Sequence, residues 1–426
     1  MFGGVQAVTW TDVKQMVIIL VGLLVCPLVV ISRFSGTPAD GHGHHQFAGY
    51  ISPLAVKATA DANQCTDSGA AWQVQKFYVE QGFRSNDEPT LKINTGEYNF
   101  LLGRSYAEIA AEDRSQHKTQ EQGGLELKGD RFSGLNLIES KVPKVKSERS
   151  IFDGIDVSIK NYDDLVGLKD YAKKEFIALQ LSADKAAQTT DIFDGKKLLP
   201  ALLEGVEKAR NLKNNINGYL YEAATFRLEA LQSLVADKEK EFTQAIKLAS
   251  GLQIDALANK ETVTPDENFL TSVKVFYPEN SNIKIKEIKL NAPKNWQISD
   301  GEEPKSDSPF ARFFRATAKN AKFFNVKVAP DAKLTETYFL EKPRDGALYN
   351  WNNDESQTEP FQKPILAAEI TAEIDGAEII FKQPVEYRYA DGVRGEIRRN
   401  LNVVPKISLN LAQDLLIVPK GDKPQI

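Results

Sequence analysis

The sequence predicts a mixed α+β protein of several domains, and three observations lead to this fold class. The chain has 426 residues, and at about 100–200 residues per domain this length corresponds to two to four domains. Between residues 156 and 250, apolar residues recur every three or four positions, which is the period of an amphipathic helix. After residue 253 the period falls to two, which is typical of strands with one buried face.

The composition indicates a folded chain and argues against a nucleic-acid binder. Hydrophobic residues make up 42% and charged residues 26% of the sequence, as in ordinary globular proteins. There are 53 basic and 58 acidic residues, for a net charge of −5. Basic pairs such as Arg398-Arg399 are sparse, so no basic stripe for nucleic acid is expected. Cys26 and Cys65 are too few to form a disulfide scaffold.

An apolar run extends from Met16 to Ile31 without a charged residue. It is slightly shorter than the roughly 20 residues of a membrane-spanning helix, and Pro27 interrupts it. The stretch GGVQAVTWTDVKQMVIILVG, residues 3–22, resembles one internal span of the sodium/solute symporter family. This resemblance implies that residues 1–28 are a symporter-like segment with one membrane span. The alternative is a buried strand-plus-helix segment.

Three of the four histidines lie close together, at His42, His44 and His45. Glycines and a proline around them predict a loop, and the stretch from Gln46 onward has the pattern of a helix. Neutral imidazole binds Zn²⁺ well, and His42 and His45 reach one centre if a helical turn begins between them. Asp40 is the one additional ligand nearby. The alternatives are an inert surface loop and a remnant of an affinity tag.

The sequence around these histidines, SGTPADGHGHHQFAG, resembles the second conserved motif of the PIG-L/LmbE family of zinc-dependent N-deacetylases. Residues 29–426 as a whole resemble the long multidomain bacterial branch of that family. The supporting stretches are Ile93 to Gly124, Arg131 to Ser140, Ser150 to Asp156, Ala329 to Pro343 and Val385 to Pro405.

The resemblance implies hydrolysis of an N-acetyl group on a sugar or glycoconjugate such as one containing N-acetylglucosamine, with Zn²⁺ as the cofactor. It makes His45 a zinc ligand and His42 the group that stabilises the oxyanion. Residues 29–155 would then be the C-terminal part of an α/β, Rossmann-like deacetylase domain. Possible substrate contacts in this family context are Asp40, His44, Arg104, Arg114 and His117.

The sequence departs from the family in its first motif, Ala-His-Pro-Asp-Asp-Glu, which has no counterpart here. No histidine precedes His42, and the only later one is His117. The other zinc ligands and the general base are therefore missing. We expect a truncated deacetylase, inactive or weakly active by itself, joined to the symporter-like segment.

The remaining regions are expected to be structural. Residues 125–140 alternate around Gly129-Asp130 and predict a hairpin. Residues 156–252 predict a helical hairpin or bundle, with Gly251 as a C-cap. Residues 258–426 predict one or two immunoglobulin-like β-sandwiches, and Asp375-Gly376 is a hairpin turn signal within them.

Two further functions remain open at this stage. The chain is alternatively a non-catalytic accessory protein that binds carbohydrate or a partner, with Trp296, Trp351 and tyrosines as a stacking platform or as core. The third possibility is a fragment of a sodium/solute symporter. The family resemblance implies an extracytoplasmic location, periplasmic or secreted, and membrane tethering if residues 16–31 insert into a membrane.

Overall fold

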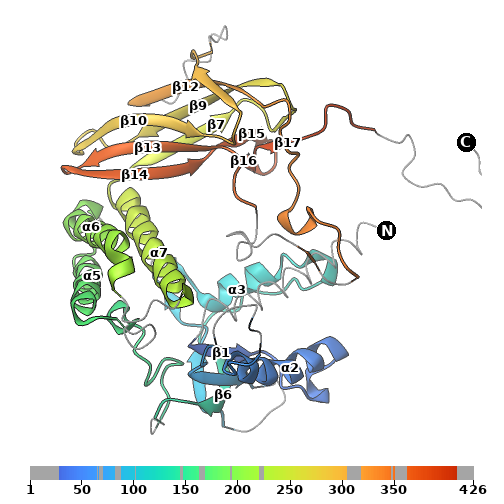
Figure 1. Cartoon of the computed structure of the whole chain (residues 1–426). Coiled ribbons are helices and arrows are strands. Elements are labelled where there is room, and N and C mark those ends of the chain that lie inside the picture. The colour runs from blue at the N-terminus through green and yellow to red at the C-terminus, as the bar shows by residue number, and fades with distance from the viewer. Residues whose placement is uncertain are drawn as a thin grey trace, which may run out of the picture. The chain divides into compact units, whose positions relative to one another are not determined.

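The computed structural model describes residues 28–64, 66, 71–81, 88–100, 102–143, 147–162, 168–191, 194–219, 225–304, 318–346, 349–350 and 362–409. They form a mixed α+β structure with several sheets and several helices, which confirms the predicted fold class (Figure 1). The chain divides into two compact units. The first contains Met1–Ile177 and Asn215–Gln232, and the second contains Ala178–Asn214 and Ser233–Ile426.

The first unit is built on a four-stranded sheet with the order β1-β2-β6-β3. Its strands are β1 (Val29–Ser32), β2 (Lys76–Glu80), β3 (Leu91–Asn94) and β6 (Phe132–Ser140). β1 and β2 are parallel, and helix α2 (Gly43–Thr59) connects them, so these three elements are a βαβ unit. β6 runs antiparallel to both β2 and β3.

Both faces of this sheet are covered by apolar side chains. Val29 and Tyr78 belong to a cluster on one side together with Leu91 and Leu135. Val30 and Phe77 belong to a second cluster, which includes Val56 of α2. Because neighbouring residues of a strand point to opposite faces, β1 contributes to both clusters. The short strand is thereby fixed on both sides where the histidine loop begins.

The shorter elements of the first unit lie between the strands of the sheet or after them along the chain. They are η1 (Pro38–Asp40), β4 (Tyr98–Asn99), β5 (Arg104–Ser105), α3 (Tyr106–Arg114), η2 (Lys118–Gln120) and η3 (Ile159–Tyr162). Helix α3 directly follows its N-cap residue, Ser105. It begins with a reciprocal cap, in which the Ser105 amide donates to the Glu108 carboxylate and the Glu108 amide donates to Ser105 Oγ.

The predicted hairpin at residues 125–140 is wrong. Residues 122–128 form no strand, and Phe132–Ser140 pairs instead with β2 and β3. Local alternation identified the strand, but it carried no information about the distant partners. Pairing with two neighbours buries Leu135, which a two-stranded hairpin on the surface would leave exposed.

One buried ion pair lies in this unit, at the start of β2. Lys76 Nζ contacts both carboxylate oxygens of Glu148 at 3.0 Å, and Tyr78 donates a hydrogen bond to the same carboxylate at 2.5 Å. The side chains of Lys76 and Glu148 are only 1% and 5% exposed. Burial, followed by the hydrogen bond to Glu148, raises the pKa of the Tyr78 hydroxyl well above its ordinary range.

The predicted helical region is confirmed for the described residues and contains three α-helices. They are α5 (Asp170–Gln188), α6 (Leu199–Asn215) and α7 (Thr225–Ala249), with the short helices η4 (Gly195–Leu198) and η5 (Ile216–Gly218). Gly205 lets α6 approach α7 closely, since a Cβ there would lie 2.2 Å from the Phe242 ring. Gly251 follows α7 with a φ of +69°, as expected of a C-cap glycine.

The second unit also contains the predicted strands. They are β7 (Gln253–Ala258), β8 (Thr262–Val263), β9 (Asn268–Phe276), β10 (Ile283–Asn291), β11 (Gln297–Asp300), β12 (Asn320–Lys327), β13 (Ala367–Ile374), β14 (Ala377–Pro384), β15 (Glu386–Asp391), β16 (Gly395–Asn400) and β17 (Asn402–Val403), with η6 (Tyr338–Leu340). β10-β13-β14 form one sheet, β11-β12-β9-β7-β15-β16 form a second, and β17 pairs with β8 (Figure 1).

The alternating apolar residues face the core of this unit, as predicted. Val273, Phe324, Ile370 and Ile379 are all at most 3% exposed. The Asp375-Gly376 turn joins β13 to β14, and both residues have positive φ angles, 48° and 86°. The helices contact β14, because the Arg210 guanidinium donates to the Glu378 carbonyl and Lys247 donates to the Gln383 side chain.

The apolar run at residues 16–31 falls partly outside the described residues. Its last part, Val29–Ile31, belongs to strand β1. Among the described residues, no helix has the length and apolar character needed to cross a membrane. The symporter-like stretch, residues 3–22, lies outside the described residues.

Candidate functional site

The three clustered histidines lie where the chain passes from β1 to α2. β1 ends at Ser32, and the chain then makes a turn through η1 before α2 begins at Gly43. His42 is the N-cap residue of α2, and His44 and His45 are in its first turn. The helical turn that would let His42 and His45 reach one centre is therefore present. In α/β proteins, ligands bind beyond the carboxyl ends of the parallel strands, and this loop occupies such a position.

Asp40 organises the loop that carries the histidines. Its carboxylate accepts hydrogen bonds from the backbone amides of Ser35, Gly36 and Thr37 at 3.1, 2.7 and 3.0 Å. Burial acts to raise the pKa of Asp40, but the hydrogen bonds from Ser35, Gly36 and Thr37 outweigh it, so the pKa is lowered. The Asp40 carboxylate is thus committed to the backbone of its own loop.

A close contact between two glycines fixes this loop on α2. A Cβ on Gly49 would lie 2.1 Å from the Gly36 nitrogen, and Gly36 has a φ of +81°. Only glycine avoids the clash at position 49, and glycine is favoured at position 36 because other residues rarely adopt that φ. The sequence of the loop therefore specifies the distance between the loop and the helix.

His45 is the best-oriented imidazole of the cluster. Its ring stacks on Phe34 with centroids 4.1 Å apart and an interplanar angle of 13°. Its Nδ1 lies 3.1 Å from the Asp40 carbonyl oxygen, which can only accept a hydrogen bond. A proton on Nδ1 satisfies this contact and leaves the lone pair on Nε2, the arrangement that metal-binding histidines commonly have.

The other two histidines lie close to His45 but are less constrained. The His42 ring centroid is 3.8 Å from that of His45 at an angle of 33°, and 5.7 Å from that of His44. Both His42 and His44 are exposed, and His42 makes no side-chain capping bond to the helix. The cluster thus consists of one held imidazole and two accessible ones.

The described residues do not complete a zinc site. Among them, no group of three or more His, Cys, Asp or Glu side chains is placed to hold a metal ion. Asp40, the expected additional ligand, uses its carboxylate oxygens for the loop backbone. A catalytic zinc usually takes three protein ligands. The side chains described here therefore do not fit a resident catalytic zinc by themselves.

The predicted substrate contacts on and after α3 have local partners. Arg104 forms ion pairs with Glu112 at 2.6 Å and Glu126 at 3.4 Å. Arg114 donates to the Gln122 side chain, and His117 Nδ1 lies 3.1 Å from the Arg114 carbonyl oxygen. Both guanidinium groups therefore make contacts that stabilise the segment around α3.

Sequence reasoning missed three features of this site. These are the stacking of Phe34 on His45, the glycine contact and the role of Asp40 in the loop. The spacing Thr37-x-x-Asp40 is a capping-box pattern and could have revealed the last of them. The ring stacking and the glycine contact depend on distances between segments, which cannot be read from the sequence.

Comparisons with known proteins supply no family name. No model of a protein family matches the chain. No curated protein matches it significantly either.

Proposed function

We propose that this chain is a PIG-L/LmbE-like N-deacetylase that hydrolyses an N-acetyl group on a sugar or glycoconjugate and is weakly active by itself. The observation that supports this best is the orientation of His45, whose Nδ1 is engaged by a backbone carbonyl and whose ring is held by Phe34. An imidazole that serves only to cover a surface needs neither constraint. The location after a parallel strand, at a helix N-terminus, supports the same proposal.

His45 and His42 take different roles in this proposal. His45 presents Nε2 as a ligand or as a proton acceptor. His42 lies at the N-terminus of α2, where free backbone amides and the helix dipole favour negative charge. A donor at this position stabilises the oxyanion that forms when an amide carbonyl is attacked. Because the ligand set is incomplete, we assign no step to a metal ion.

The finer fold assignments belong to the same proposal. Residues 29–155 represent the C-terminal part of a Rossmann-like deacetylase domain, which the single parallel pair β1–β2 with its connecting helix supports. Residues 258–426 represent immunoglobulin-like sandwich structure, which the two mainly antiparallel sheets of the second unit support.

Acetate release from an N-acetylglucosamine conjugate tests the proposal. The full chain is incubated in zinc-containing buffer, and acetate is measured enzymatically over hours. We expect slow release that is abolished in His45→Ala and reduced in His42→Ala by about 100-fold or more, since removal of an oxyanion donor has this effect. His42→Ala should fold normally, because the side chain makes no capping bond.

Lys57→Ala serves as the matched control, since Lys57 is exposed and lies in the last turn of the same helix. Release that is equal in the parent chain, His45→Ala and Lys57→Ala would contradict the proposal. So would the absence of any release above that of buffer.

A second function, as a non-catalytic carbohydrate-binding accessory protein, is favoured by one surface feature. The rings of Tyr387 and Tyr389 on β15 stack with centroids 6.0 Å apart, and the Arg399 guanidinium lies 5.6 Å from the Tyr389 ring. Tyr389 is exposed. Trp296, one of the aromatics expected in a platform, instead packs edge-on against Phe269, and Trp351 lies outside the described residues. Binding of chitooligosaccharide that Tyr389→Ala abolishes would support the accessory function.

A further inference from the structure

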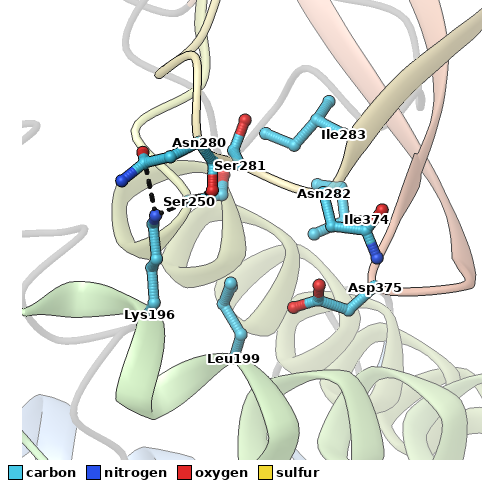
Figure 2. Close-up of a pocket in the computed structure, with 9 residues that line it drawn as sticks. All are labelled: Lys196, Leu199, Ser250, Asn280, Ser281, Asn282, Ile283, Ile374 and Asp375. Carbon is cyan, nitrogen blue, oxygen red and sulfur yellow. Dashed lines mark hydrogen bonds between the residues drawn. The ribbon is translucent and has the colours of Figure 1, made fainter.

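A small hollow lies in the second unit, between the start of α6, the start of β10 and the end of β13 (Figure 2). Its volume is about 130 Å³. The buried side chains of Leu199, Ile283 and Ile374 contribute apolar surface to it. Neither the deacetylase proposal nor the histidine cluster involves any of these residues.

The polar lining of the hollow carries one positive and one negative group. Lys196 of η4 donates to the backbone carbonyl and to the side-chain oxygen of Asn280, at 3.1 and 3.0 Å. Figure 2 shows the Lys196 ammonium and the Asp375 carboxylate on opposite sides of Leu199. In the described part of the chain, the Asp375 carboxylate has no hydrogen-bond or ion-pair partner, and the Asp375 amide is held by the Asn282 carbonyl at 3.1 Å.

Tight contacts hold the backbone that carries these two groups, while the side chains of Lys196 and Asp375 are both exposed. A Cβ on Gly195, beside Lys196, would lie 2.9 Å from the Ala249 carbonyl oxygen. Asp375 belongs to a two-residue hairpin turn with positive φ angles. A site whose polar groups are held before the ligand arrives loses less entropy on binding. The backbone of the hollow and the Lys196 ammonium group, which Asn280 holds, are therefore organised in advance of any occupant.

The volume and the charges together define the class of ligand. A cavity of about 150 Å³ accommodates a molecule of the size of benzene, with about six non-hydrogen atoms. A hollow of 130 Å³ is therefore too small for an N-acetylhexosamine. A small amino acid has the right number of atoms, and its ammonium and carboxylate groups complement Asp375 and Lys196.

We propose that this hollow binds a small zwitterionic amino acid of the size of alanine. The ligand's ammonium group pairs with Asp375, its carboxylate replaces one Asn280 contact of Lys196, and its methyl group rests on Leu199 and Ile283. This binding is independent of the deacetylase proposal, because it uses neither the histidine cluster nor α2.

Calorimetric titration of the full chain tests the proposal. The probes are L-alanine, propionate, which lacks the ammonium group, and ethylamine, which lacks the carboxylate. We expect saturable alanine binding with a dissociation constant of about 1 mM, a value typical of a very small ligand. Propionate and ethylamine should each bind at least tenfold more weakly.

Two variants locate the binding site. Asp375→Asn and Lys196→Met should each weaken alanine binding at least tenfold. The matched control is Lys197→Met, because the neighbouring Lys197 pairs with Asp191 and does not line the hollow. Alanine binding that survives Asp375→Asn unchanged would overturn the proposal. In the unaltered chain, propionate binding as tight as alanine binding would also overturn the proposal. So would the absence of saturable alanine binding.

Discussion

Substitution of Glu148 by Gln should destabilise the first unit strongly, because it removes the negative charge that compensates a buried lysine. The Lys76 side chain is 1% exposed and contacts both Glu148 oxygens at 3.0 Å. Breaking a buried pair by removing one partner typically costs about 3–5 kcal/mol. The amide can still accept from Tyr78, so the lost charge accounts for most of this cost. At about 1.4 kcal/mol per factor of ten, the opening equilibrium should change roughly 10²- to 10⁴-fold.

Hydrogen exchange measured by mass spectrometry is the appropriate assay, because a chain with two compact units is not expected to unfold in a single two-state transition. Peptides from β2 and β6 report on the first unit, and peptides from β13 and β14 serve as an internal reference. We expect protection of the β2 and β6 amides to fall by the factor above, while protection of β13 and β14 stays the same.

Two further variants make this reasoning refutable. Glu139→Gln removes a partner of Lys141 in an exposed pair, so it should change protection by less than about 1 kcal/mol. The double variant Lys76→Met with Glu148→Gln removes both charges, keeps an acceptor for the Tyr78 hydroxyl and should restore most of the protection. Unchanged protection of the β2 and β6 amides in Glu148→Gln would refute this explanation. So would protection in the double variant that is as low as in Glu148→Gln.

Three further predictions concern the stability of the first unit. Gly49→Ala places a methyl group against the Gly36 backbone and should cost about 1–3 kcal/mol, measured as lower protection of α2 amides. Phe77→Ala leaves a cavity where a side chain is 2% exposed and should cost about 3–5 kcal/mol by the same assay. The hydrogen bond from Lys128 is the main cause that lowers the pKa of Glu108 from 4.5 to about 2. Since the pKa is lowered in the folded state, this stabilisation is complete above pH 4.5 and is lost as the pH falls toward 2. Protection of α3 measured across that range should show the loss, and Glu108→Gln should remove the pH dependence.

The elements of the fold were largely predictable because each rests on a local pattern. Val273 and Val275 alternate along one strand, and both are fully buried. Asp375-Gly376 forms the predicted hairpin turn because few residue pairs adopt positive φ angles at two successive positions. Strand pairing was less predictable. β6 was expected to pair with residues close in sequence, yet it lies between β2 and β3. Burial of apolar side chains against both neighbouring strands outweighs the advantage of the short loop that a local hairpin would have.

The candidate site was predictable in its residue types and less so in its geometry. Spacing placed His42 and His45 within one helical turn, and the structure brings their ring centroids to 3.8 Å. Asp40 was expected to be a metal ligand because it lies near the histidines, whereas its capping-box spacing from Thr37 indicates the role in the loop that the structure shows. Phe34 lies eleven positions before His45, and only the folded loop shows that their rings stack.

The central claim, that the histidine cluster performs amide hydrolysis, is tested most directly by acetate release from an N-acetylglucosamine conjugate. The decisive comparison is between the parent chain and His45→Ala at equal concentration in zinc-containing buffer. We expect slow release by the parent chain and release at the level of buffer by His45→Ala. Equal release by the two proteins, or none by the parent chain, would contradict it.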